Sequence, residues 1–127
     1  MAETLLRNVF VIPGNVPSSK NSRVWTGKFF VASKSTNTYI RNTKQYYKEY
    51  AQLFKTEAEK RQKPLRVSFK FIRGTKHKFD CINPLQTVQD LMVRNGWLPD
   101  DNSDEIIPVF EEYEYDKEHA GVMITLL

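Results

Sequence analysis

The sequence predicts one α+β domain over residues 1–127, in which a mixed β-sheet packs against two main helices. Three observations predict this class. Two segments show helical spacing of apolar residues, several short runs are rich in β-branched and aromatic residues, and the two kinds of segment do not alternate strictly. A chain of this length, with 40% hydrophobic and 27% charged residues, can bury one ordinary core.

The first half of the chain is expected to supply two strand regions and the longest helix. Residues 5–12 are rich in Val, Ile, Leu and Phe and stop at Pro13, which predicts a strand. Residues 23–32 predict a hairpin with a Thr-Gly turn. From about residue 37 to residue 62, apolar residues recur at helical spacing without Gly or Pro, and Pro64 ends the pattern.

The second half is expected to supply a central strand, a short helix and two further strands. Residues 65–72 alternate apolar and polar side chains, which is typical of a half-buried strand. A helix is predicted over residues 83–94, with Asn83 as its N-cap and Gly96 just past its end. Two more strands are expected around an acidic connector, at residues 105–110 and 122–127.

Charge is distributed unevenly along the chain, although the net charge is only +4. Residues 4–48 contain eight basic residues and no acidic one, whereas residues 100–118 contain nine acidic residues and one lysine. A basic half of this kind attracts a polyanion, and the aromatic residues interleaved with its cations favour a nucleic acid. The alternative is a solvated basic face that the acidic end of the same or a partner chain neutralises.

The composition also bears on the compartment and on cofactors. No run approaches the roughly 20 apolar residues that span a bilayer, and the N-terminus lacks the apolar region of a secretory signal. One cysteine excludes an internal disulfide and suits a reducing compartment, and two distant histidines argue against a structural zinc site. We therefore expect a cytoplasmic protein with no membrane partner and no small-molecule cofactor.

Carboxylates gather at both ends of the second predicted helix. Asp80 precedes the helix, Asp90 lies on its polar ridge, and Asp100 and Asp101 follow it. Clustered carboxylates repel one another unless a cation lies between them, and hard divalent metals take oxygen ligands. The two ends, about 18 Å apart along a 12-residue helix, meet only if the chain folds back. The alternative is that Asp80 merely caps the helix and residues 100–102 form a solvated turn.

The acidic segment resembles the core pattern of the RusA-like Holliday-junction resolvases, which are crossover junction endodeoxyribonucleases. The family pattern is D-x-D-N-x-x-K, then D-x-L, then G and D-D; the matching residues are Asp80-x-x-Asn83, Asp90, Gly96 and Asp100-Asp101. A loop at residues 17–21 resembles the family's P-S-x-N loop with one extra residue. The resemblance extends loosely over most of the chain and is specific over residues 78–102.

The resemblance implies a divergent member of that family: a homodimer that binds four-way or other branched DNA and serves DNA recombination and repair. Each subunit would hydrolyse a phosphodiester bond with Mg²⁺, or Mn²⁺, held by carboxylates. Asp80 and Asp101 match two of the family's three metal-site aspartates. The expected catalytic residues are thus Asp80, Asp90 and Asp101, and the expected metal ligands are Asp80, Asp100 and Asp101.

Two departures from the family pattern are important. Ile82 stands where the family has its second aspartate, and Gln86 stands where it has a lysine. Isoleucine cannot ligate a metal, and glutamine cannot supply positive charge to a phosphate. Asp90 and Asp100 are the candidates to compensate. The alternative is a catalytically inactive nucleic-acid-binding protein of the same fold.

Four residues are candidates for contacts with the nucleic acid. Lys76 and Lys78 lie two positions apart on the approach to Asp80, so in an extended segment they point the same way and would hold a phosphate near the metal. Arg73 belongs to the same basic loop. Asn21 is the fourth candidate; it would bind either backbone or the substrate.

Overall fold

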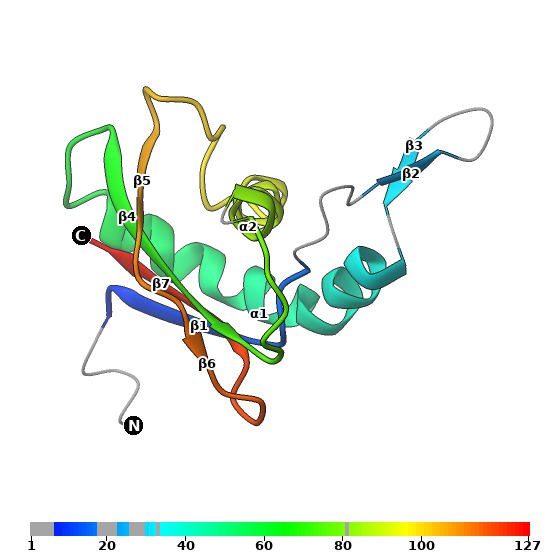
Figure 1. The fold of residues 1–127 in the computed structure, drawn as a ribbon. Helices are drawn as coiled ribbons and strands as arrows, with labels where there is room; N and C mark the ends of the chain where they lie inside the picture. The colour runs from blue at the N-terminus through cyan, green and yellow to red at the C-terminus, as the bar shows by residue number, and fades with distance from the viewer. Residues whose placement is uncertain (1–6, 18–22, 26–29, 33, 81) are drawn as a thin grey trace.

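The expected α+β architecture is present in a computed structural model, which describes residues 7–17, 23–25, 30–32, 34–80 and 82–127. Within these ranges, two helices and seven strands follow one another along the chain (Figure 1). Their bounds, in order, are β1 (Val9–Pro13), β2 (Arg23–Trp25), β3 (Phe30–Ala32), α1 (Lys34–Ala58), β4 (Leu65–Arg73), α2 (Ile82–Arg94), β5 (Ile106–Phe110), β6 (Glu114–Tyr115) and β7 (Gly121–Leu126).

The main sheet is mixed, as predicted, and has five strands. Four of them run in the order β1-β7-β4-β5, and β6 also pairs with β4. β7 is antiparallel to both β1 and β4, whereas β5 and β6 run parallel to β4. β4 therefore lies at the centre, where Val67 pairs with Leu126 on one side and with Pro108 on the other. β2 and β3 form a separate antiparallel pair, which confirms the strand pairing of the predicted hairpin; its predicted Thr-Gly turn lies outside the described residues.

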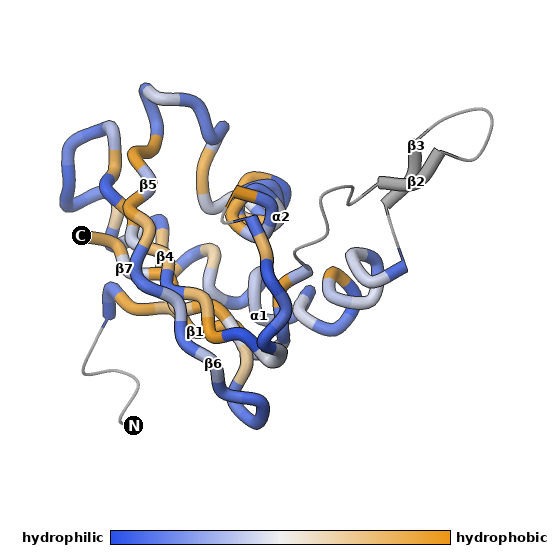
Figure 2. The backbone as a smooth tube through the Cα atoms, viewed as in Figure 1, coloured by the Kyte–Doolittle hydropathy of each residue, from blue (hydrophilic) through white to orange (hydrophobic). Residues whose placement is uncertain are grey.

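One face of the sheet shares a hydrophobic core with both helices. Phe10 of β1 lies 5.6 Å from Phe54 of α1 and 5.5 Å from Trp97, which follows α2, measured between ring centroids. Figure 2 shows hydrophobic residues along β1 and β7 and along part of α2, with hydrophilic residues in the surrounding loops. Each fully buried side chain of this size contributes on the order of 1.5–3 kcal/mol. The buried apolar residues of β4 alternate, as its sequence pattern predicts: Leu65, Val67, Phe69 and Phe71.

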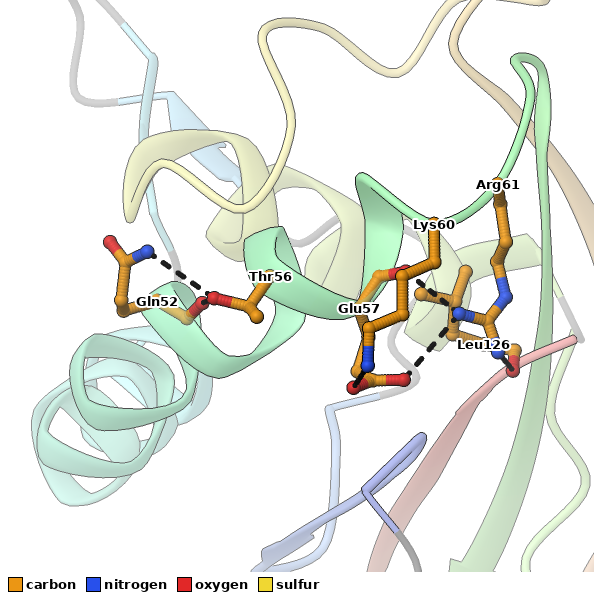
Figure 3. Close-up of polar contacts among 6 residues, drawn as sticks. All are labelled: Gln52, Thr56, Glu57, Lys60, Arg61 and Leu126. Atoms are coloured by element: carbon orange, nitrogen blue, oxygen red, sulfur yellow. Dashed lines mark hydrogen bonds and ion pairs between the residues drawn. The ribbon is translucent and has the colours of Figure 1, made fainter.

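The predicted segment 37–62 corresponds to α1, which begins earlier, at Lys34, and ends earlier, at Ala58. The buried residues of α1, two of which are threonines, recur every three or four positions, which makes one continuous buried face. Beyond its end, Arg61 donates from Nη1 to the carbonyl oxygen of Glu57 at 2.7 Å and from Nη2 to that of Leu126 at 3.5 Å (Figure 3). The end of α1 is therefore tied to the end of β7.

The two ends of α2 differ in how well the sequence predicts them. The helix begins at Ile82, and the N–H of Asn83 already donates to the carbonyl oxygen of Asp80 at 3.2 Å. Asn83 thus lies inside the first turn, and its predicted role as the N-cap is wrong. The other end is confirmed: Gly96 has a positive φ of 82° and follows the last helical residue, Arg94.

The predicted strands correspond to β1, β4, β5 and β7, with bounds that differ from the predicted ones by at most four residues. Residues 5 and 6 of the first predicted strand lie outside the described residues. β6 was not predicted, since it lies in the segment interpreted as an acidic connector. In the described part of the chain, neither helix is long and apolar enough to cross a membrane.

Candidate nucleic-acid interface

The C-terminal end of β4 is joined to the segment that follows β1. Arg73, the last residue of β4, donates from Nη1 to the carbonyl oxygen of Val16 at 2.7 Å. The next residue, Gly74, donates its N–H to Oδ1 of Asn15, also at 2.7 Å. These two bonds connect residues more than fifty positions apart, and they fix the start of the basic loop that leads to α2.

A groove of about 1170 Å³ lies at this end of the sheet. Asp80 is the only carboxylate among its described lining residues. Positive charge therefore predominates in the groove. Its charged and polar wall comes mainly from the loop before α2 and from the first turn of that helix: Arg73, Lys76, His77, Lys78, Asp80 and Asn83.

Arg73 is a buried cation on the wall of the groove. Its side chain is only 3% exposed, and its guanidinium carbon lies 4.5 Å from the ring centroid of Phe79. Nε has no hydrogen-bond partner among the described residues. Burial lowers the pKa of Arg73 from its ordinary value, but a guanidinium stays protonated in proteins. The predicted phosphate contact thus belongs to the groove, although the side chain is largely covered and also holds Val16.

The two lysines predicted to bind phosphate both reach the groove. Lys76 and Lys78 are exposed lining residues of the loop before Asp80. The ammonium nitrogen of Lys76 lies 5.0 Å from the ring centroid of Tyr115, which also lines the groove. The structure therefore brings these two lysines and Asp80 together on one surface.

Asp80 is exposed in the groove. Its backbone carbonyl accepts the N–H of Asn83, while no hydrogen bond or ion pair joins its carboxylate to another described residue. Ile82, at the position of the family's second aspartate, is 71% exposed, and Gln86 is exposed as well. A carboxylate among cations, with no donor among the described residues, is available to a ligand.

Asp100 is engaged in a turn instead. Its Oδ1 accepts the N–H of Asp101 at 2.8 Å, and its Oδ2 accepts from Nδ2 of Asn102 at 3.0 Å. These two bonds, with the backbone donor contributing most, lower the pKa of Asp100 from its ordinary value. Asp101 is half-buried in the same turn, and Asp90 is exposed on α2. None of these three aspartates lines the groove around Asp80.

The metal site predicted from three carboxylates is not assembled in the part of the chain that the structure describes. There, no three His, Cys, Asp or Glu side chains form a group that could hold a metal ion. The groove offers the carboxylate of Asp80 and the neutral side-chain oxygen of Asn83. This donor set fits a Mg²⁺ ion shared with substrate phosphates, and it does not fit a cage made by the protein alone.

Some residues of the groove were not predicted, and one predicted residue cannot be placed. Asn21 lies outside the described residues. The unpredicted lining residues include Asn15, Phe79, Tyr113 and Tyr115. The alternation in Tyr113-Glu114-Tyr115 is the sequence signal that would have indicated two rings on one side of an extended segment.

The chain has also been compared with known proteins. No protein-family model matches it, and no curated protein matches its sequence.

Proposed function

We propose that the protein is a metal-dependent endonuclease that binds branched DNA, such as a four-way junction, and hydrolyses a phosphodiester bond beside Asp80. One observation carries the proposal: Asp80 shares a groove with the cationic side chains of Lys76 and Lys78 and with the buried guanidinium of Arg73. Cations of this kind attract the phosphate backbone whatever its sequence. The RusA-like pattern around Asp80 supports the same reaction.

Each basic residue has its own role in the proposal. Lys76 and Lys78 are exposed, so they bind phosphates directly and position the strand. Arg73 is held by Val16 and stacks on Phe79, so it fixes the loop and keeps positive charge behind the wall of the groove. A guanidinium without a carboxylate partner strengthens the attraction for an anion in its neighbourhood.

Mg²⁺, or Mn²⁺, is the cofactor of the proposed reaction. Asp80 and Asn83 would hold the ion together with phosphate oxygens of the DNA, since Mg²⁺ is usually bound through one or two carboxylates plus substrate phosphates. Asp101 is the second ligand that the resemblance implies, and Asp90 and Asp100 are the possible substitutes. When bound, the ion supplies an activated water and stabilises charge on the phosphate.

Two parts of the proposal come from the resemblance and from composition. Resolution of a four-way junction needs two cuts, so we propose a homodimer whose twofold axis relates two grooves. We place the protein in the cytoplasm, because its single cysteine suits a reducing compartment.

A nucleic-acid-binding protein without hydrolytic activity is the second candidate. A specific observation favours it: Ile82 projects into solvent at the position of a family aspartate, so Asp80 is the only described carboxylate of the groove. This second candidate would bind DNA through the same basic groove and the same phosphate contacts, without a metal ion and without hydrolysing the DNA.

The test uses a labelled synthetic four-way junction incubated with Mg²⁺ or Mn²⁺. Asp80→Asn keeps the shape of the side chain and removes its charge, so we expect the cleavage rate to fall by about 10²–10³-fold while junction binding is kept. Asp104→Asn, an exposed aspartate outside the groove, is the matched control and is expected to cut normally. Asp101→Asn tests the second ligand.

The outcomes separate the candidates. Cleavage by Asp80→Asn at the wild-type rate would overturn the role of Asp80. Tight, salt-dependent binding without cleavage by the wild type would favour the second candidate. Absence of binding to any DNA would overturn both.

A further inference from the structure

The segment that runs from β5 to β6 along the groove contains one residue more than the part of β4 that it passes. Phe110 of β5 pairs with Phe69, and Glu114 of β6 pairs with Ile72. Four steps along this segment therefore match three steps along β4. Residues 111–113 belong to neither strand, so the extra residue shifts the register of β6 against β4 by one relative to β5. A shift of one residue changes the face of the sheet on which the following side chains lie.

The register shift lets two acidic side chains occupy the face of the sheet away from the core. Glu111 accepts a hydrogen bond from Ser68 at 2.8 Å, and Glu114 forms an ion pair with Lys70 at 2.7 Å. Ser68 and Lys70 are alternate residues of β4, so they lie on one face. Glu111 and Glu114 are three positions apart, so in a regular strand they would lie on opposite faces. The extra residue between them lets both side chains lie on the same face. Both carboxylates are thus kept out of the groove.

The groove side of the same segment carries two tyrosines. Tyr113 and Tyr115 both line the groove, with 52% and 46% of their surface exposed. Phe79 packs edge-on against Tyr113 with 5.0 Å between ring centroids, and the Lys76 ammonium lies 5.0 Å from the Tyr115 centroid. Positions two apart on an extended strand are about 6.6 Å apart. That is roughly twice the 3.4 Å spacing of successive bases along a nucleic-acid strand.

We propose that Tyr113 and Tyr115 form a stacking site for an unpaired nucleobase, while Lys76 and Lys78 bind the adjoining phosphates. This inference rests on the proposed function and names its substrate class: nucleic acid with unpaired bases, such as an opened branch point or a single-stranded segment. A base inside a continuous duplex does not present its flat face, so paired DNA engages the cations alone.

The test compares two labelled single strands of about 12 nucleotides, an oligothymidylate and a strand of the same length with abasic sites, in a fluorescence-anisotropy titration. The wild type is expected to prefer the oligothymidylate. Tyr113→Ala and Tyr115→Ala each lower that affinity by about 5- to 100-fold and leave abasic binding unchanged. Tyr113→Phe and Tyr115→Phe keep the rings and the affinity. Tyr46→Ala, which removes a 40% exposed tyrosine of α1, is the matched control.

Equal affinity of the wild type for the two strands would overturn the stacking site, and that comparison needs no variant. Lys76→Ala, measured in parallel, separates this failure from failure of the proposed function. If the groove binds phosphates, this variant binds both strands more weakly, whatever the tyrosines do. Unchanged binding by the lysine variant as well as the tyrosine variants would overturn the groove itself.

Discussion

Asp80 and Asp100 stand at the two ends of α2, and the difference between them lies in their hydrogen-bond donors. Asp100 accepts from the N–H of Asp101 and from the amide of Asn102, so its charge is satisfied within its own turn. The carboxylate of Asp80 has no such donor among the described residues, and it faces a groove that contains Lys76 and Lys78. An aspartate thus stabilises a turn after the helix, whereas the aspartate before the helix is open to a ligand.

The aromatic residues beside these two segments differ in the same way. Trp97, between α2 and the acidic turn, is 2% exposed and donates from Nε1 to the carbonyl oxygen of Tyr47 at 2.7 Å. Tyr113 and Tyr115, beside Asp80, are about half exposed. Burial and local hydrogen-bond donors therefore distinguish the two regions better than residue type does. One region stabilises the fold, and we propose that the other binds DNA.

The largest expected effect concerns stability at Trp97. Trp97→Ala removes ring contacts with Phe10 and Phe54 and leaves a cavity, so we expect the free energy of unfolding to fall by about 3–5 kcal/mol. Tyr113→Ala, at an exposed position, is expected to change it by at most about 0.5 kcal/mol. Urea denaturation followed by circular dichroism measures both. If Tyr113→Ala lowered the free energy of unfolding as much as Trp97→Ala does, the proposed difference between the exposed and the buried ring would be wrong.

The next effect concerns the salt dependence of DNA binding. Lys76→Ala and Lys78→Ala each remove one phosphate contact, so each is expected to reduce the slope of log K against log [salt] by about 1. Lys60→Ala is the matched control, because Lys60, which follows α1, forms an ion pair with Glu57 in the last turn of that helix (Figure 3). Titrations at several salt concentrations give the slopes. If Lys60→Ala changed the slope as much as Lys76→Ala, DNA would not be confined to the groove.

The smallest effect concerns pH and the acidic turn. The folded-state pKa of Asp100 is lowered, so its ionised form stabilises the fold above the ordinary aspartate pKa of about 3.9, and this contribution is lost as pH falls through the lowered value. Asp100→Ala is therefore expected to be less stable than the wild type at pH 7, with a difference that shrinks in acid. Urea midpoints at pH 7 and pH 3 measure it. A constant difference would contradict the role assigned to the charge.

Local rules account for much of what the sequence predicts. The alternation of β4 and the glycine after α2 reflect interactions within a few residues, and both are present as expected. The start of α2 is predicted one residue too late. The helix begins at Ile82, and the N–H of Asn83 already donates to the carbonyl oxygen of Asp80. The lysines and Asp80 lie together because they are close in sequence.

The rest of the groove depends on contacts between distant segments. Arg73 donates to Val16, fifty-seven positions away, and the pairing of β6 with β4 is shifted by one residue relative to that of β5. No local pattern specifies such a pairing. Whether Asp101 approaches Asp80 likewise depends on how the chain runs after α2, which spacing along the sequence cannot determine.

We propose that nucleic acid binds at the groove beside Asp80 and not at the turn around Asp100. The most direct measurement is an NMR titration of the ¹⁵N-labelled protein with a four-way DNA junction, following backbone amide shifts. We expect the largest changes at residues 76–80 and 113–115, with residues 100–104 nearly unchanged. Large changes confined to residues 100–104, with the groove amides unmoved, would contradict the account.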